Sequence, residues 1–99
     1  MEVIKYNKLV RDKIPEIIQN DGKICKTEIL SDDEYLKMVD VKLDEELDEY
    51  HKDPSIKELA DLLEVIYAAT IARGYSLEEL EAERIRKVQK NGHLRIKYF

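Results

Sequence analysis

The sequence contains few of the residues that break helices or cross-link chains. Its 99 residues include three glycines, two prolines, one cysteine and no tryptophan. So few turn residues favour long helices over a fold of many short strands. The single cysteine, Cys25, cannot form an internal disulfide, and no cysteine and histidine residues have zinc-ligand spacing. We therefore expect an all-α protein of a reducing cytoplasm, with Cys25 a buried or half-buried apolar filler.

Long apolar runs and an excess of basic residues are also missing. No apolar stretch reaches membrane-spanning length, and the N-terminus lacks the apolar segment of a signal peptide. The net charge is -5, whereas general nucleic-acid-binding proteins usually carry a basic face. We expect one soluble, cytoplasmic domain, residues 1–99, that binds neither membranes nor nucleic acid.

Capping signals divide the chain into four helices of unequal length. Ser31, Ser55 and Ser76 each precede a glutamate by three residues, the pattern of a capping box at a helix N-terminus. The expected helices run from about Pro15 to Asp21, from Ser31 to about His51, from Ser55 to about Arg73, and from Ser76 to Asn91. The fold class is therefore a small all-α bundle with an antiparallel central hairpin and short extended segments at the termini. Residues 93–99 alternate apolar and polar side chains, which indicates a short strand or an extended tail that could pair with residues 1–6.

Two acidic clusters flank the turn of the expected hairpin, Glu45-Glu46-x-x-Glu49 and Glu58-x-x-Asp61. The apolar stripe of the preceding helix consists of Leu36, Val39, Leu43, Leu47 and Tyr50. Glu46 lies at the edge of this stripe and Glu49 beyond it on the same flank, whereas Glu45 points away from the core. Because helices joined by a short connection run antiparallel, Glu46 and Glu49 can face Glu58 and Asp61.

The helix that carries Asp61 is apolar around nearly its whole circumference. From Leu59 to Ala72 its only residues that are not apolar are Asp61, Glu64 and Thr70, so we expect burial on nearly all sides. Buried carboxylates need compensation, and a bound divalent cation supplies it. Oxygen donors without histidine or cysteine favour Mg²⁺, or Mn²⁺, over zinc or copper. The competing interpretation is an ordinary solvated acidic face, with Glu58 merely completing a helix cap.

Other charged residues have two interpretations each. Glu45 and Glu64 are candidates for a general base beside a metal, although Glu45 would need a second subunit or a bent helix to reach it.

The last expected helix carries acidic residues first and basic residues last. Acidic residues near the start of a helix and basic residues near its end interact favourably with the helix macrodipole, which alone can explain the order. The alternative, weighed equally, is that some of the basic residues contact a phosphate. The basic residues are Arg84, Arg86, Lys87 and Lys90.

The combined acidic pattern resembles that of the MazG-like all-α nucleoside triphosphate pyrophosphohydrolases, whose superfamily includes phosphoribosyl-ATP pyrophosphohydrolase and dimeric dUTPases. The run from Tyr6 to Pro15, YNKLVRDKIP, is similar to the opening signature of one branch of small MazG-like proteins. Lys87-x-x-Lys90-Asn91-Gly92 resembles the basic C-terminal segment of that branch. Together these motifs cover most of the chain. The spacing between Glu49 and Glu58 is shorter than in longer MazG-type proteins, which implies a shallow pocket close to the turn.

The resemblance implies a Mg²⁺-dependent enzyme that cleaves a nucleoside triphosphate between its α and β phosphates, releasing a nucleoside monophosphate and pyrophosphate. By matching positions, the metal ligands would be Glu46, Glu49, Glu58 and Asp61, and Glu45 would be an accessory acid beside the catalytic Glu46 and Glu49. The phosphate contacts would be Arg11, Lys13, Lys87 and Lys90. Members of the family assemble as homodimers or homotetramers, and Tyr35 and Met38 are candidates for interface or core positions. The alternatives are phosphoribosyl-ATP hydrolysis, against which the N-terminal run argues, and a helical interaction module without catalytic activity.

Overall fold

Serine caps determine where three of the four helices begin. In the computed structural model, which describes residues 7–99, Ser31, Ser55 and Ser76 each accept a hydrogen bond from the backbone N–H three residues later, over 3.3, 3.3 and 3.1 Å. The helices are α1 (Ile14–Asn20), α2 (Asp32–Lys52), α3 (Ile56–Ala72) and α4 (Leu77–Asn91). The all-α prediction is confirmed, because residues 7–99 form four helices at the expected places and no strand.

The capping boxes differ from the prediction in one respect. Only the box at Ser31 is complete among these helices, with Glu34 accepting a hydrogen bond from the Ser31 backbone N–H over 3.3 Å. At Ser55 the cap consists of the serine hydroxyl alone. The carboxylate of Glu58 instead lies among other acidic side chains at the hairpin interface. Glu58 is therefore not explained by capping.

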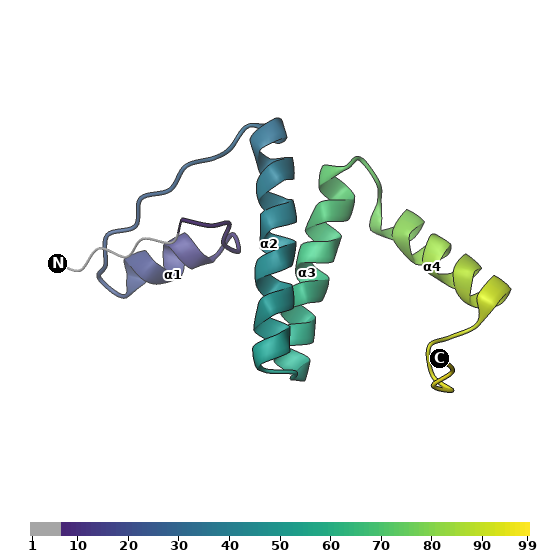
Figure 1. Ribbon diagram of the computed structural model, residues 1–99. Coiled ribbons are helices and arrows are strands. Elements are labelled where there is room, and N and C mark those ends of the chain that lie inside the picture. The colour runs from purple at the N-terminus through teal and green to yellow at the C-terminus, as the bar shows by residue number, and fades with distance from the viewer. Residues whose placement is uncertain (1–6) are drawn as a thin grey trace.

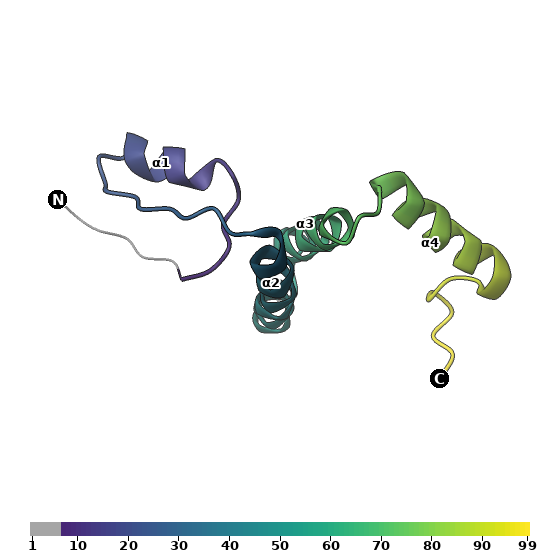
Figure 2. The same cartoon turned by 90° about the horizontal axis from the view of Figure 1, so that it is seen from above.

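The centre of the molecule is the antiparallel hairpin of α2 and α3 (Figure 1). Arg73, at the end of α3, donates a hydrogen bond to Asp40 of α2 over 3.1 Å and ties the open end of the hairpin together. The other two helices, α1 and α4, lie on opposite sides of this hairpin in both views (Figures 1 and 2). Of the two, only α4 packs against a hairpin helix, near the C-terminal end of α3. The hairpin alone therefore supplies the rigid frame of the molecule.

The buried interior is small. Val39 is the most buried side chain, at 1% exposure, and the other buried apolar residues among those described are Ile18 and Val65. Leu36, Leu43 and Tyr50 of the predicted stripe are half-buried, while Leu47 is exposed. The prediction that α3 is buried on nearly all sides is wrong for the single chain, because Leu59, Leu63 and Ile71 of α3 are exposed. Cys25 is half-buried, as expected.

The shape is elongated, with extents of 55 × 31 × 20 Å and a radius of gyration of 17.0 Å. A compact domain of this length has a radius of gyration of about 13 Å. The difference arises because α1 and α4 extend away from the hairpin (Figure 2). Much apolar surface therefore remains uncovered in one chain.

The C-terminal tail follows an abrupt helix end. Gly92 terminates α4 with a positive φ of 86°, a conformation that glycine adopts without strain. Residues 93–99 are irregular, contain bends and form no strand, and Lys97 has a positive φ of 71°. The suggested partner, residues 1–6, lies outside the described part of the chain. Within residues 7–99, no helix combines the length and the apolar character that crossing a bilayer requires.

Val39→Ala is expected to lower the free energy of unfolding by about 2 kcal/mol, because two buried methyl groups are lost and a cavity is left beside the hairpin. Urea denaturation followed by circular dichroism measures the change. Val41→Ala is the matched control, since Val41 lies on the same helix with 44% exposure. Equal effects of the two substitutions would show that Val39 is not the centre of the packing.

Candidate metal centre

Three acidic side chains converge across the hairpin. Glu46 of α2 and Glu58 and Asp61 of α3 each place a carboxylate oxygen so that the three atoms lie within 4.8 Å of one another. The antiparallel course of the helices produces this meeting, because Glu46 lies just before the turn and Glu58 just after it. Asp61 is one helical turn beyond Glu58 on the same face. We call Glu46, Glu58 and Asp61 the carboxylate triad.

Two basic side chains compensate part of the charge of the triad. The ammonium of Lys42, one turn before Glu46, lies 3.1 Å from Glu46 Oε1. Arg11, from the segment before α1, donates a hydrogen bond to Asp61 Oδ1 over 2.8 Å. The side chains of Lys42 and Glu46 are only 17% and 14% exposed, so their pairing takes place largely out of water. The third carboxylate also has a basic neighbour, since Lys57 Nζ lies 3.6 Å from Glu58 Oε1.

Glu45, which the helical wheel points away from the core, lies outside the carboxylate triad but shares a basic partner with Glu46. Lys42 Nζ lies 3.4 Å from Glu45 Oε2, so one lysine links Glu45 to Glu46. Glu45 is half-buried in one chain. Glu49 is exposed and does not belong to the group of oxygens within 4.8 Å. The structure thus brings Glu46, Glu58 and Asp61 together and leaves Glu49 to one side.

The donor set of the triad suits a hard divalent cation. Three carboxylates offer only oxygen, which Mg²⁺ and Mn²⁺ prefer, and opposite ligands of Mg²⁺ are about 4.2 Å apart. Adjacent ligands are about 2.9 Å apart, so the triad oxygens, which now lie within 4.8 Å of one another, would draw closer around the ion. Three protein ligands would leave positions for water or phosphate oxygens. The triad could therefore hold Mg²⁺ and still bind a substrate.

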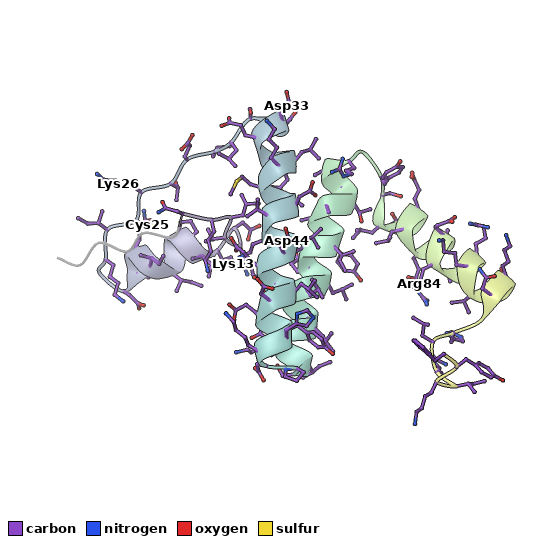
Figure 3. All side chains as sticks on the ribbon, in the orientation of Figure 1. Lys13, Cys25, Lys26, Asp33, Asp44 and Arg84 are labelled. Atoms are coloured by element: carbon purple, nitrogen blue, oxygen red, sulfur yellow. The ribbon has the colours of Figure 1, made fainter. Side chains whose placement is uncertain are left out.

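The predicted phosphate contacts lie at different distances from the triad. Arg11 contacts the triad directly through Asp61. Lys13 occupies the N-cap position of α1 without a side-chain capping hydrogen bond, and Figure 3 places it on the α1 side of the hairpin. Lys87 and Lys90 belong to α4, on the other side of the hairpin in Figures 1 and 2. One chain therefore brings only Arg11 of the four into contact with the carboxylates.

The basic half of α4 is partly engaged with its own acidic half. Arg84, far from the hairpin in Figure 3, donates hydrogen bonds to Glu81, and Arg86 does the same to Glu83. These hydrogen bonds lower the pKa of both glutamates below their ordinary value. Because the folded pKa values are depressed, the stabilisation is present at neutral pH and is lost as the pH falls through them. Both glutamates are fully exposed, so water screens the pairs strongly.

An open groove lies along α3 toward the open end of the hairpin, and none of the three triad residues lines it. Its volume is about 600 Å³, within the usual range of ligand sites. Glu64 and Ala68 of the lining follow Asp61 by three and seven residues, so the groove continues along the same face of α3. Two tyrosines, Tyr35 of α2 and Tyr67 of α3, contribute aromatic surface. The full lining is Asp32, Tyr35, Glu64, Tyr67, Ala68, Ile71, Ala72 and Leu77.

Sequence reasoning did not identify Lys42 or the aromatic groove. Lys42 precedes Glu45 and Glu46 by three and four residues, the spacing of helical ion pairs, so a signal was present. The groove had no comparable signal. Tyr35 and Tyr67 are 32 residues apart in sequence, and only the register of the hairpin places both on one groove.

Comparisons with known proteins find a relative that matches part of the chain. A search of protein-family models finds no match, and a search of solved structures finds none either. Among curated proteins, an uncharacterized protein of Mycolicibacterium smegmatis (strain ATCC 700084 / mc(2)155) is 54% identical over 41 residues, which make up 41% of this chain and 42% of that protein. The chain thus spans less than half the length of this relative. The carboxylate triad and its surroundings are therefore the basis for inferring a function.

Proposed function

We propose that the protein is a Mg²⁺-dependent, MazG-like nucleoside triphosphate pyrophosphohydrolase of the cytosol that acts as a homodimer or homotetramer. The observation that carries the proposal is the convergence of Glu46, Glu58 and Asp61 at one point of the hairpin interface. Three largely buried or half-buried carboxylates at one point repel one another and favour a divalent cation between them. The resemblance of the acidic pattern to MazG-like enzymes supports the same chemistry.

In the proposed reaction, water attacks the α- or the β-phosphorus, and the bond from that phosphorus to the oxygen that bridges the α and β phosphates breaks. Nucleoside monophosphate and pyrophosphate leave. Glu46, Glu58 and Asp61 would hold the cation. When bound, Mg²⁺ neutralises charge on the phosphates and lowers the pKa of a water molecule. Glu45 accepts a proton from the attacking water. This role is supported by Lys42, whose ammonium contacts both Glu45 and the triad member Glu46.

In this proposal, different residues around the triad bind the phosphates and the base of the substrate. Arg11 binds a phosphate oxygen with the guanidinium that now contacts Asp61. The base and sugar occupy the groove along α3, whose lining begins on that helix at Glu64, three residues after Asp61. Tyr35 and Tyr67 offer flat apolar surfaces for a base in this groove. The open groove suits several nucleotides better than one, which agrees with a role in removing surplus or noncanonical nucleotides.

A second candidate function is a helical interaction module without catalytic activity. One specific observation favours it, since Lys42 and Arg11 already compensate two carboxylates without a metal. In that case the triad is a structural ion-pair network. Mg²⁺ would then change neither the stability of the protein nor any reaction rate.

The test is pyrophosphate release from a panel of nucleoside triphosphates, with and without Mg²⁺. The proposal expects release from at least one substrate, strict dependence on the divalent ion, and nucleoside monophosphate in equal amount. Phosphoribosyl-ATP belongs in the panel as the substrate of the related enzyme class. Release of orthophosphate instead of pyrophosphate, or no turnover of any substrate together with no binding of Mg²⁺, would refute the proposed activity.

A further inference from the structure

Each tyrosine of the groove along α3 has an acid beside it at the same spacing. Asp32 lies three residues before Tyr35 on α2, and Glu64 lies three residues before Tyr67 on α3. Residues three apart on a helix are neighbours on one face, so each helix contributes an acid and a tyrosine side by side. Both tyrosines are half-buried and both acids are exposed. The groove therefore combines aromatic surface with carboxylates from both helices.

The side chains that line the groove offer many hydrogen-bond acceptors and few donors. Carboxylates accept hydrogen bonds, and the two tyrosine hydroxyls are the only side-chain donors among the described residues of the lining. No lysine, arginine, histidine, asparagine or glutamine of the described chain lines it. The rest of the lining is apolar and consists of Ala68, Ile71, Ala72 and Leu77. A polar ligand is therefore bound best if it supplies hydrogen-bond donors of its own.

The order of residues along α3 matches the order of groups in a nucleotide. A helix rises 1.5 Å per residue, so Glu64 lies about 4.5 Å and Tyr67 about 9 Å beyond Asp61 along the helix axis. Phosphates at the carboxylate triad are thus followed by Glu64 and then by the aromatic surfaces that suit a base. Asp32 begins α2 at the open end of the hairpin (Figure 1). A base on the tyrosines accordingly lies between two acids.

We infer that the groove selects nucleotides whose base carries an exocyclic amino group, and that Asp32 and Glu64 determine this preference. Cytosine and adenine present an N–H donor where uracil and hypoxanthine present a carbonyl oxygen. The amino group donates a hydrogen bond to a carboxylate, whereas a carbonyl oxygen in the same place is a second acceptor and is repelled. The preference rests on the proposed function, because the triad has to hold the phosphates beside the groove.

This preference narrows the substrates of the proposed enzyme. Uracil and hypoxanthine are the deaminated forms of cytosine and adenine, with an oxygen in place of the amino group. The groove favours the intact bases over these deaminated forms. The proposed enzyme would therefore remove surplus nucleotides more readily than the products of deamination.

Relative turnover tests the preference. The ratio of kcat/KM is measured for CTP against UTP and for ATP against ITP at one Mg²⁺ concentration. The amino-bearing member of each pair is expected to be preferred about tenfold, a modest factor because the groove is open to water. Equal values within each pair, or a preference for UTP and ITP, would overturn the inference.

Amide variants test the two acids directly. In the double variant Asp32→Asn, Glu64→Gln, each acceptor becomes an amide that also donates, so the preference is expected to fall about fivefold or more. Asp33→Asn is the matched control and keeps the preference, because Asp33 follows Asp32 on α2 but does not line the groove (Figure 3). If Glu64 acted only as a general base, the rates on all four substrates would fall together. Unchanged ratios in the double variant would therefore overturn the assignment.

A binding measurement separates this preference from the proposed hydrolysis. Cytidine, uridine, adenosine and inosine contain no phosphate, so they are titrated into isotope-labelled protein in chelator and followed by NMR. Cytidine and adenosine are expected to shift the signals of Tyr35 and Tyr67 and to bind about tenfold more tightly than uridine and inosine. This result without turnover of any triphosphate would refute the hydrolysis and leave a selective base site.

The opposite outcome is equally informative. Turnover of triphosphates with equal rates and equal nucleoside affinities would leave the pyrophosphohydrolase in place and overturn the preference. No change in the signals of Tyr35 and Tyr67 with any nucleoside would overturn the groove as the site of the base.

Discussion

Asp61→Asn is expected to lower the rate of pyrophosphate release by at least about 100-fold while the protein remains folded. The substitution keeps the size of the side chain but removes the negative charge that a divalent cation requires. It also removes the acceptor charge from the hydrogen bond that Arg11 makes over 2.8 Å. Because Asp61 is one of only three triad members, the remaining two carboxylates hold Mg²⁺ much more weakly.

Two measurements separate a catalytic loss from a structural one. Pyrophosphate release at saturating substrate gives the rate, and the Mg²⁺-dependent shift of the melting temperature reports metal binding without turnover. Asp44→Asn is the control, because Asp44 is an exposed aspartate on the same hairpin that lies outside the triad. Full activity and an unchanged metal-dependent shift in Asp61→Asn would remove the triad from the proposed mechanism. Retained hydrolysis in the double variant Glu46→Ala, Asp61→Ala would place the chemistry elsewhere.

Lys42→Met is expected to destabilise the metal-free protein by about 2 kcal/mol or more and to strengthen Mg²⁺ binding about tenfold. The ammonium of Lys42 lies 3.1 Å from Glu46 and 3.4 Å from Glu45, so it competes with a divalent cation for the same carboxylate charge. Without the positive charge of Lys42, the repulsion between Glu46 and the carboxylates of Glu58 and Asp61 is less compensated. Saturating Mg²⁺ is then expected to restore most of the lost stability.

Lys57→Met provides a matched control for this prediction. Lys57 also pairs with a triad member, at 3.6 Å from Glu58 Oε1, but its side chain is 76% exposed. An exposed pair contributes about 0.5 kcal/mol or less, so little change is expected in stability or metal affinity. Thermal melts in chelator and in Mg²⁺, combined with calorimetric titration, measure both quantities. Weaker Mg²⁺ binding in Lys42→Met would show that Lys42 assists the cation instead of competing with it.

The helices were predictable because their signals are local. A serine hydroxyl that accepts a backbone hydrogen bond three residues later needs no distant partner, so Ser31, Ser55 and Ser76 marked the starts of α2, α3 and α4. Gly92 likewise ends α4 through its own backbone conformation. The strand alternative for residues 93–99 had no such basis, because a strand requires a partner that the local pattern does not supply.

The candidate site was predictable to the extent that it follows helical periodicity. Glu58 and Asp61 lie one turn apart on α3, and Glu46 lies just before the turn, so a hairpin brings them together. Helical periodicity could not predict which of Glu46 and Glu49 approaches the carboxylates of α3, because both lie on one flank of α2. Their separation depends on the register between α2 and α3, which places Glu46 within 4.8 Å of the other carboxylates and leaves Glu49 exposed.

By itself, the sequence determined the four helices, the antiparallel hairpin and the acidic character of its interface, because caps, periodicity and a short connection act over a few residues. Only the tertiary structure decided which cations meet those acids, since Arg11 and Asp61 are fifty positions apart and meet through the course of the whole chain. It also decided how much of α3 is covered. An apolar helix is buried only where a neighbour packs against it, and in one chain α2 and α4 leave Leu59, Leu63 and Ile66 of α3 exposed.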